Sequence, residues 1–179
     1  GTFTTLNDAY IDSLTLNELS GTIISDTKIP TFEEFLDYAS KSGVKIYPEI
    51  KAINSTANID AMISLIEQYG MIENCVIQSF NLANLSYVRS INNVVEVGFL
   101  GTATGQATYE SAVNSMRDLG RGYLLWSAAS LISTPAIVAY ARSQGVDVAA
   151  YTIDESNTAR ELMKIGVNKI MSDITLELE

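Results

Sequence analysis

The sequence predicts an α/β fold in which helices cover a parallel β-sheet. Short runs that are apolar almost throughout alternate with longer segments whose apolar residues recur at helical spacing. The 179 residues suffice for one substantial core, and the hydrophobic (47%) and charged (18%) contents are typical of a globular protein. We therefore expect one domain over residues 1–179, with about six parallel strands that alternate with helices.

The first half of the chain shows three helical patterns and three apolar runs. The first helix is expected over residues 31–43, with Thr31 and Glu34 as a capping box and Gly43 as its stop. The strand "VKIYPEI" follows. The next pairs are a helix at 58–70 with the strand "NCVIQSF", and a helix at 82–92 with the strand "VVEVGFL".

The second half continues in the same rhythm. Helices are expected over residues 108–120, 133–145 and 154–166, the last of them capped by Asp154. The strands "RGYLLWS", "VDVAAYT" and "VNKIMSD" lie between and after these helices. The expected strands are thus centred near residues 46, 76, 97, 124, 149 and 170.

Two architectures share this alternation, the doubly wound sheet and the (β/α)8 barrel. No glycine-rich phosphate-binding fingerprint follows any strand, which disfavours the nucleotide-binding version of the wound sheet. In a barrel, the side chains at the carboxyl ends of the strands form the active site. Five residues with functional side chains lie at or just beyond such ends: Glu49, Ser79, Trp126, Tyr151 and Asp173.

Composition excludes several classes of function. A net charge of −10 argues against nucleic acid and anionic membranes as partners. No apolar stretch approaches the roughly 20 residues of a transmembrane helix. The absence of His excludes Ser-His-Asp and Cys-His catalysis and any zinc site that needs imidazole. The single Cys75 lies in an apolar run, so we expect a buried structural thiol.

Four segments resemble the glycerophosphodiester phosphodiesterase family. "IPTFEEFLDYASKSGVKIYPEIK", residues 29–51, is similar to the family's "IPTLEE…EIK", and residues 11–19 resemble the stretch before it. "VIQSFNLANLSYVRS", residues 76–90, resembles the "QSF" strand end and the helix after it. Residues 145–173 resemble the closing pattern from "WTVN" to "GVDGIITD". The resemblance implies a (β/α)8, TIM-barrel-like fold.

The chain departs from the family at its catalytic motifs. The resemblance implies that the first two barrel strands carry His-Arg-Gly, Glu-Asn, Glu-x-Asp and His-Asp elements, and none of them occurs ahead of the first expected strand of this chain. We therefore expect an incomplete barrel that holds the third to the eighth strand. A missing N-terminal segment, with His-Arg-Gly and His-Asp motifs, or a second chain would then be needed to close it.

The resemblance also assigns roles to the end of the "VKIYPEIK" strand. Glu49 stands where the family places a carboxylate ligand for a divalent cation, Ca²⁺ or Mg²⁺. Lys51, two residues on and on the same side of an extended chain, is expected to be the catalytic cation that contacts the phosphate. Without the family, a surface ion pair is the simpler interpretation. A fragment with one such carboxylate is expected to bind the cation weakly, if at all.

Four further residues are assigned to substrate binding. Ser79 and Phe80 match the family's "SF", although a cap for the following helix remains an alternative for Ser79. Tyr151 stands where the family commonly has Trp, as a pocket wall or as a core aromatic. Trp126 ends a strand and either lines the pocket mouth or packs in the core. Asp173 matches the family's final "TD", as a structural hydrogen-bond acceptor.

Two functions follow as expectations from the resemblance. The first is metal-dependent hydrolysis of a glycerol phosphodiester to glycerol phosphate and an alcohol, with this chain inactive alone because the family's catalytic His is absent from it. The second is a non-catalytic module that binds glycerol-phosphate polymers or glycans, as on a phage tail or a cell surface. Cytoplasmic and extracellular or phage locations are both compatible with the sequence.

Overall fold

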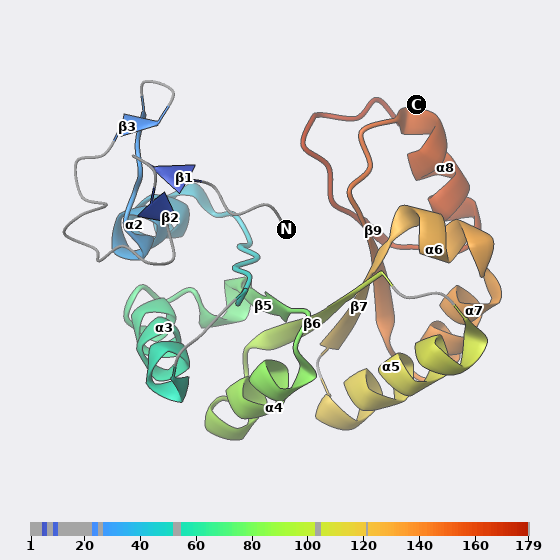
Figure 1. Cartoon of the computed structure of the whole chain (residues 1–179), viewed down its shortest axis with the longest axis horizontal. Coiled ribbons are helices and arrows are strands. Elements are labelled where there is room, and N and C mark those ends of the chain that lie inside the picture. Colours follow the sequence, from blue (N-terminus) through green and yellow to red (C-terminus); the bar gives the residue numbers. More distant parts are fainter. Residues whose placement is uncertain are drawn as a thin grey trace. The chain divides into compact units, whose positions relative to one another are not determined.

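The computed structural model describes residues 5–6, 9–10, 23–24, 27–51, 55–102, 105–120 and 122–178 (Figure 1). The chain divides into two compact units, Gly1–Ser42 and Gly43–Glu179, and each is described by itself. Residues 11–19, one of the segments that resemble the phosphodiesterase family, lie outside the described residues. The single domain over residues 1–179 stays a prediction.

Within its described residues, the first unit contains two short antiparallel strand pairs and one helix. The strand β1 (Thr5–Leu6) pairs with β2 (Ala9–Tyr10), and β3 (Ile23–Ile24) pairs with β4 (Thr27–Lys28). The helix α2 spans Phe32–Ser42. The predicted capping box is confirmed, since the Thr31 N–H donates to Glu34 and the Glu34 N–H donates to the Thr31 hydroxyl at 2.8 and 3.1 Å.

The second unit is a parallel sheet with helices between its strands. Its five strands follow in chain order: β5 (Val76–Ser79), β6 (Glu96–Gly101), β7 (Gly122–Ser127), β8 (Asp147–Tyr151) and β9 (Lys169–Ile170). The helices are α3 (Thr56–Gln68), α4 (Leu82–Ile91), α5 (Gln106–Leu119), α6 (Ala128–Ser133), α7 (Ala136–Ser143) and α8 (Ser156–Lys164), with a 3-10 turn, η2, at Ile72–Asn74. The predicted α/β fold of a TIM-barrel type is confirmed, and over the described residues the barrel is not closed.

The expected strand at residues 44–50 forms two isolated parallel bridges rather than a sixth strand. Ile46 pairs with Cys75, and Glu49 pairs with Gln78. The Val76 N–H donates to the Ile46 carbonyl at 2.9 Å, and the Gln78 N–H donates to the Pro48 carbonyl at 2.8 Å. The pairing between these bridges requires an N–H at position 48, which proline lacks. The segment therefore continues the sheet with one ladder hydrogen bond missing.

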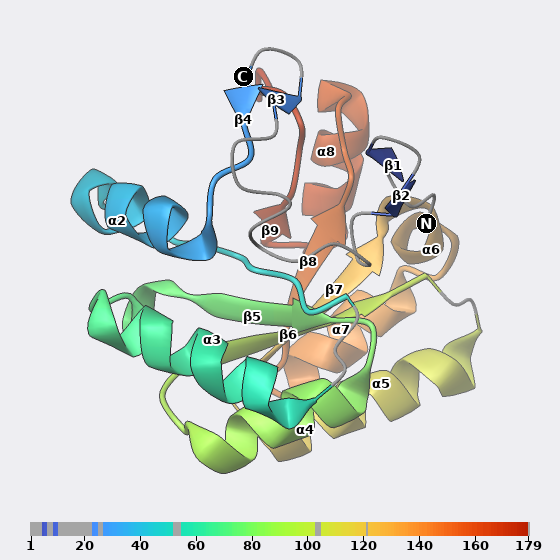
Figure 2. The same cartoon turned by 60° about the vertical axis from the view of Figure 1, so that its left-hand side comes forward.

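The helices α4, α5 and α7 pack along one face of the sheet (Figures 1 and 2). The core between them contains fully buried aliphatic residues from strands and helices: Ile77, Leu85, Val97, Val113, Leu124 and Ile137. Cys75 is buried as expected, and burial raises the pKa of its thiol to about 12. Among the described residues, no helix combines the length and the apolar character that a membrane crossing requires.

The other face of the sheet has a polar end and an apolar middle. At the amino ends of the strands, Lys45 pairs with Glu96, which also accepts a hydrogen bond of 2.6 Å from the Tyr123 hydroxyl. Lys169 pairs with Asp147 at 2.9 Å, and its ammonium lies 4.0 Å from the centre of the Tyr123 ring. The Lys169 ammonium lowers the pKa of Asp147. Further along the strands, an apolar cluster follows: Val76, Leu100, Tyr123, Leu125 and Ala149, with Tyr47, Tyr151 and Met171 against it.

Gly101 leaves the space in which the Trp126 ring lies, and this close approach gives a test of the sheet packing. A Cβ atom at position 101 would lie 2.2 Å from the ring. We expect Gly101→Ala to lower the free energy of unfolding by about 1–3 kcal/mol, as overpacking does, measured by urea denaturation. In a Trp126→Leu background the same change should cost less. An equal loss in both backgrounds would contradict the close packing.

Candidate functional site

The carboxyl ends of the strands carry the acid and the amine that the sequence assigned to a site. Glu49 is held by its bridge to Gln78, and the Ile50 N–H donates to the Gln78 carbonyl at 2.7 Å. The Lys51 ammonium lies 3.3 Å from the Glu49 carboxylate, and the exposed fractions of the two side chains are 80% and 25%. The surface ion pair between Glu49 and Lys51, the simpler interpretation of this sequence, is thus present. An ion pair this exposed contributes little to stability, so it leaves both groups available to a ligand.

Two aromatic side chains lie beside this acid. The rings of Phe80 and Tyr151 meet edge to face, with 6.4 Å between their centroids. The Tyr151 hydroxyl donates to the Gly101 carbonyl at 3.0 Å, which fixes the ring at the end of β8. Burial and the negative charge of Glu49 raise the pKa of Tyr151 to about 12. The structure therefore brings together three of the predicted site residues, Glu49, Phe80 and Tyr151.

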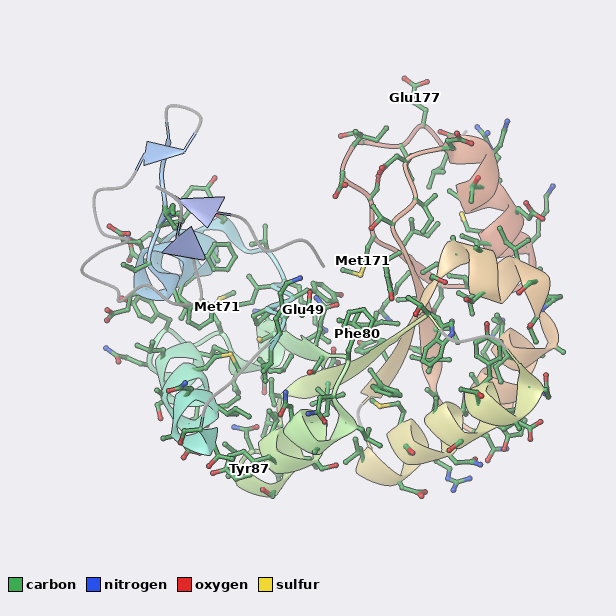
Figure 3. The ribbon with its side chains drawn as sticks, in the orientation of Figure 1. Glu49, Met71, Phe80, Tyr87, Met171 and Glu177 are labelled. Carbon is green, nitrogen blue, oxygen red and sulfur yellow. The ribbon has the colours of Figure 1, made fainter. Side chains whose placement is uncertain are left out.

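These side chains lie on the face of the sheet opposite α4 and α5. Figure 3 shows Glu49, Phe80 and Met171 on that side; they come from the segment before β5, the end of β5 and the segment after β9. Phe80 is 53% exposed, whereas Tyr151 is half-buried and packs on the apolar cluster. An aromatic wall with one exposed member suits contact with the apolar part of a ligand.

Ser79 has no hydrogen-bonding capacity left for a ligand. Its hydroxyl donates to the Ile50 carbonyl at 2.9 Å and accepts from the Asn81 N–H at 3.1 Å and from the Asn84 amide at 3.3 Å. A serine hydroxyl offers one donor and two acceptor positions, and all three are used here. The residue is 1% exposed and ties the segment before β5 to the start of α4. Its assignment to substrate binding stays a prediction without geometric support.

Trp126 packs on the helix side of the sheet, away from Glu49. Its ring lies 5.9 Å from that of Phe99 and 5.4 Å from that of Tyr109 on α5, measured between centroids. The side chain is 2% exposed. Because neighbouring residues of a strand point to opposite faces, Trp126 and the site residues on the other face cannot share one ligand surface. The core-packing alternative for this residue describes what the structure shows.

Asp154 and Asp173 connect two loops at the same end of the strands. The Asp154 carboxylate accepts from the Ser172 hydroxyl at 3.0 Å and from the Asp173 N–H at 2.9 Å. The prediction that Asp154 caps α8 was wrong, because Glu155 is the residue before that helix and no side chain caps it. Asp154 instead ties the loop after β8 to the loop after β9. Asp173 contributes its backbone to this link.

Sequence reasoning missed Gln78, the residue paired with Glu49. Its side chain is 4% exposed, and its amide nitrogen donates to the Tyr47 carbonyl at 2.6 Å. The amide oxygen is buried and has no hydrogen-bond partner among the described residues. The signal was available in the run "VIQS", where a polar residue interrupts an apolar strand.

The described residues contain no cluster of three or more His, Cys, Asp or Glu that could hold a metal ion. Glu49 and Gln78 occupy paired backbone positions at the strand ends, and the donor atoms they offer are oxygens, a carboxylate and a buried amide oxygen. Oxygen donors of this kind suit hard cations such as Ca²⁺ and Mg²⁺. The residues therefore fit part of a divalent-cation site, and water and ligand oxygens would have to complete it.

The raised pKa of Tyr151 tests the proximity of Glu49. We expect Glu49→Gln to lower this pKa from about 12 towards 10.0, because the charge is removed while burial remains. The pKa of Tyr151 is measured by ultraviolet difference titration, with Tyr151→Phe as the reference in both the wild-type and the Glu49→Gln protein. Because the folded pKa is raised, the contribution of Tyr151 to stability is lost as pH rises from about 10 to about 12. The control Glu161→Gln removes the same charge from α8; a shift equal to that of Glu49→Gln would contradict the placement.

Comparison with known proteins places the fold and the family. The sequence matches the Glycerophosphoryl diester phosphodiesterase family over residues 3–176. A comparison with curated proteins gives no match.

Three solved structures resemble the chain. A glycerophosphodiester phosphodiesterase from Parabacteroides distasonis has 21% identity and a TM-score of 0.80, covering 94% of this chain and 70% of its own. One from Thermotoga maritima has 19% identity and a TM-score of 0.67, with 93% and 69% covered. An Oleispira antarctica phosphodiesterase, solved with its product sn-glycerol-3-phosphate, has 21% identity and a TM-score of 0.70, with 83% and 59% covered. At these identities the likeness shows the fold. The match over nearly the whole sequence shows more: the chain belongs to the glycerophosphoryl diester phosphodiesterase family.

Proposed function

We propose that this chain is a glycerophosphodiester phosphodiesterase-like domain that binds a glycerol phosphodiester at the carboxyl ends of its strands. The observation that carries the proposal is the meeting of Glu49, Phe80 and Tyr151 on one face of the sheet. An acid for a cation and an aromatic wall for an alcohol are the two components that such a ligand needs. The parent reaction of such a domain would be hydrolysis of the diester to glycerol phosphate and an alcohol.

A divalent cation would supply the positive charge that this acidic protein otherwise lacks. The net charge is −10, so a phosphodiester is repelled at long range and must be held by local cations. Members of the family generally depend on divalent cations. Glu49 would hold Ca²⁺ or Mg²⁺, which polarises the phosphate when bound. Lys51, exposed and close to Glu49, would place its ammonium against a phosphate oxygen.

The aromatic pair would contact the alcohol or glycerol portion of the ligand. Phe80 offers an exposed ring edge next to Tyr151, whose own hydroxyl is already held by Gly101. Tyr151 therefore acts through its ring rather than as an acid. With its pKa near 12, the phenol stays protonated at neutral pH and does not serve as a base.

Catalysis by this chain alone is proposed to be weak or absent. The chain contains no His, the general acid or base that the family resemblance implies, and Tyr151, with its pKa raised to about 12, is not suited to replace it near neutral pH. The same observation favours a second candidate, a binding module for glycerol-phosphate polymers or glycans. Binding of such a polymer at the Glu49 site without hydrolysis would favour the binding module over the enzyme.

Cation binding at Glu49 is the first test. We expect Ca²⁺ and Mg²⁺ to bind weakly to the full chain, and Glu49→Gln to abolish binding while the fold is retained, because the amide removes the charge at nearly constant volume. Isothermal titration calorimetry measures the affinity, and circular dichroism checks the fold. Glu161→Gln, which removes an exposed acid from α8, is the matched control. Binding that survives Glu49→Gln would place the cation elsewhere.

Ligand binding through Lys51 is the second test. Lys51→Met should weaken the binding of sn-glycerol-3-phosphate about tenfold at low salt, because one charged hydrogen bond to the phosphate is lost. The affinity for Ca²⁺ should stay unchanged or rise, since the ammonium no longer competes for Glu49. Lys164→Met on α8 provides the control for the lost charge. An unchanged phosphate affinity in Lys51→Met would remove the residue from the site.

A further inference from the structure

Gln78 is a buried polar side chain on the face of the sheet that carries Glu49. It is 4% exposed and lies two residues along β5 from Val76, a member of the apolar cluster on that face. Alternation along a strand points both side chains to the same side. Its bridge partner on the neighbouring segment is Glu49, so the two side chains leave adjacent backbones at the same level.

The orientation of the Gln78 amide is determined by its neighbour. The Tyr47 carbonyl, 2.6 Å away, can only accept a hydrogen bond, so the amide nitrogen must face it. The amide oxygen is thereby turned away from Tyr47. It is buried and accepts no hydrogen bond from the described part of the chain. A buried acceptor in this condition needs a donor or a cation, because a native structure seldom leaves such a group without a partner.

Glu49 and Gln78 carry acceptor side chains on paired backbone positions, and a cation between them would be a partner for both. Among the described residues, the partner of the Glu49 carboxylate is the ammonium of Lys51, a side chain that is 80% exposed. Carboxylate and amide oxygens are both common ligands of Ca²⁺. A neutral oxygen has an added advantage, because it increases coordination without cancelling the charge that must attract a phosphate.

We propose that Gln78 is a second oxygen ligand of the divalent cation held by Glu49. The inference rests on the proposed function and deepens it, since it names how the cation is coordinated by two neighbouring segments of the sheet. The amide nitrogen stays on Tyr47 and holds the oxygen in place, so that the ligand is oriented before the cation arrives. Such support of a metal ligand by an outer hydrogen bond is common in metal sites.

Calorimetry with Ca²⁺ and Mg²⁺ on the full chain tests the inference in four proteins: wild type, Glu49→Gln, Gln78→Met and Gln78→Glu. Gln78→Met removes the oxygen at similar volume, and the Ca²⁺ affinity should fall about tenfold or more. Gln78→Glu keeps an oxygen and adds a charge but loses the hydrogen bond to the Tyr47 carbonyl, so Ca²⁺ should bind more tightly than to Gln78→Met. The loss should be smaller for Mg²⁺, which keeps more of its water ligands. The rise in melting temperature on adding Ca²⁺ should decrease in parallel.

The outcomes separate this inference from the function on which it rests. Wild-type Ca²⁺ affinity in Gln78→Met, with binding lost in Glu49→Gln, would overturn the role of Gln78 and leave the Glu49 site intact; water alone would then be the partner of the amide oxygen. Ca²⁺ binding that is weakened by neither Gln78→Met nor Glu49→Gln would overturn both the role of Gln78 and the Glu49 site. Ile77→Val, on the opposite face of β5, controls for general destabilisation. If Gln78→Met fails to fold, Gln78→Asn, which shortens the reach of the oxygen, must show the same loss.

Discussion

The site depends on the parallel hydrogen bonding between residues 46–50 and β5. Four backbone bonds, donated by the N–H groups of Ile46, Val76, Gln78 and Ile50, join this segment to residues 74–78 and set the register, and the Ser79 hydroxyl adds a fifth to the Ile50 carbonyl. A shift of one residue would turn Glu49 to the helix side of the sheet. Pro48 removes one ladder bond from this short segment, and the buried serine compensates at its end. The position of Glu49 is thus determined by how the interrupted strand at residues 46–50 pairs with its neighbour.

The two ends of the strands have different chemistry. At the amino ends, Lys45, Glu96, Asp147 and Lys169 are matched in pairs around Tyr123, which leaves no unbalanced charge. At the carboxyl ends, Glu49 is paired with an exposed lysine, and Gln78 has a free acceptor oxygen within the described structure. The groups at the amino ends are satisfied within the fold, whereas the carboxyl ends keep an exposed ion pair and a buried oxygen without a partner among the described residues. This contrast supports a site at the carboxyl ends independently of the family.

Much of the fold could be predicted because local patterns determine it. The capping box at Thr31, the helical periodicities and the apolar strands each have a local physical cause. The extent of pairing at 44–50 was not predictable from apolarity, since it depends on the missing N–H of Pro48 against its neighbour. The face of the sheet to which a side chain near a strand end points was equally unpredictable. Trp126 and Tyr151 both lie at the ends of strands, yet only Tyr151 lies near Glu49. Gln78 was missed because the lack of a partner for a buried atom is visible only once the fold surrounds it.

A divalent cation held by Glu49 and Gln78 at the carboxyl ends of the strands is the central proposal. The most direct measurement is a crystal structure of the chain grown with Ca²⁺ and sn-glycerol-3-phosphate, with the ion located by anomalous scattering. We predict one ion at about 2.3–2.6 Å from a carboxylate oxygen of Glu49 and from the amide oxygen of Gln78, with phosphate oxygens among its other ligands. An ion bound elsewhere, or a phosphate bound at these strand ends without a cation, would contradict the account.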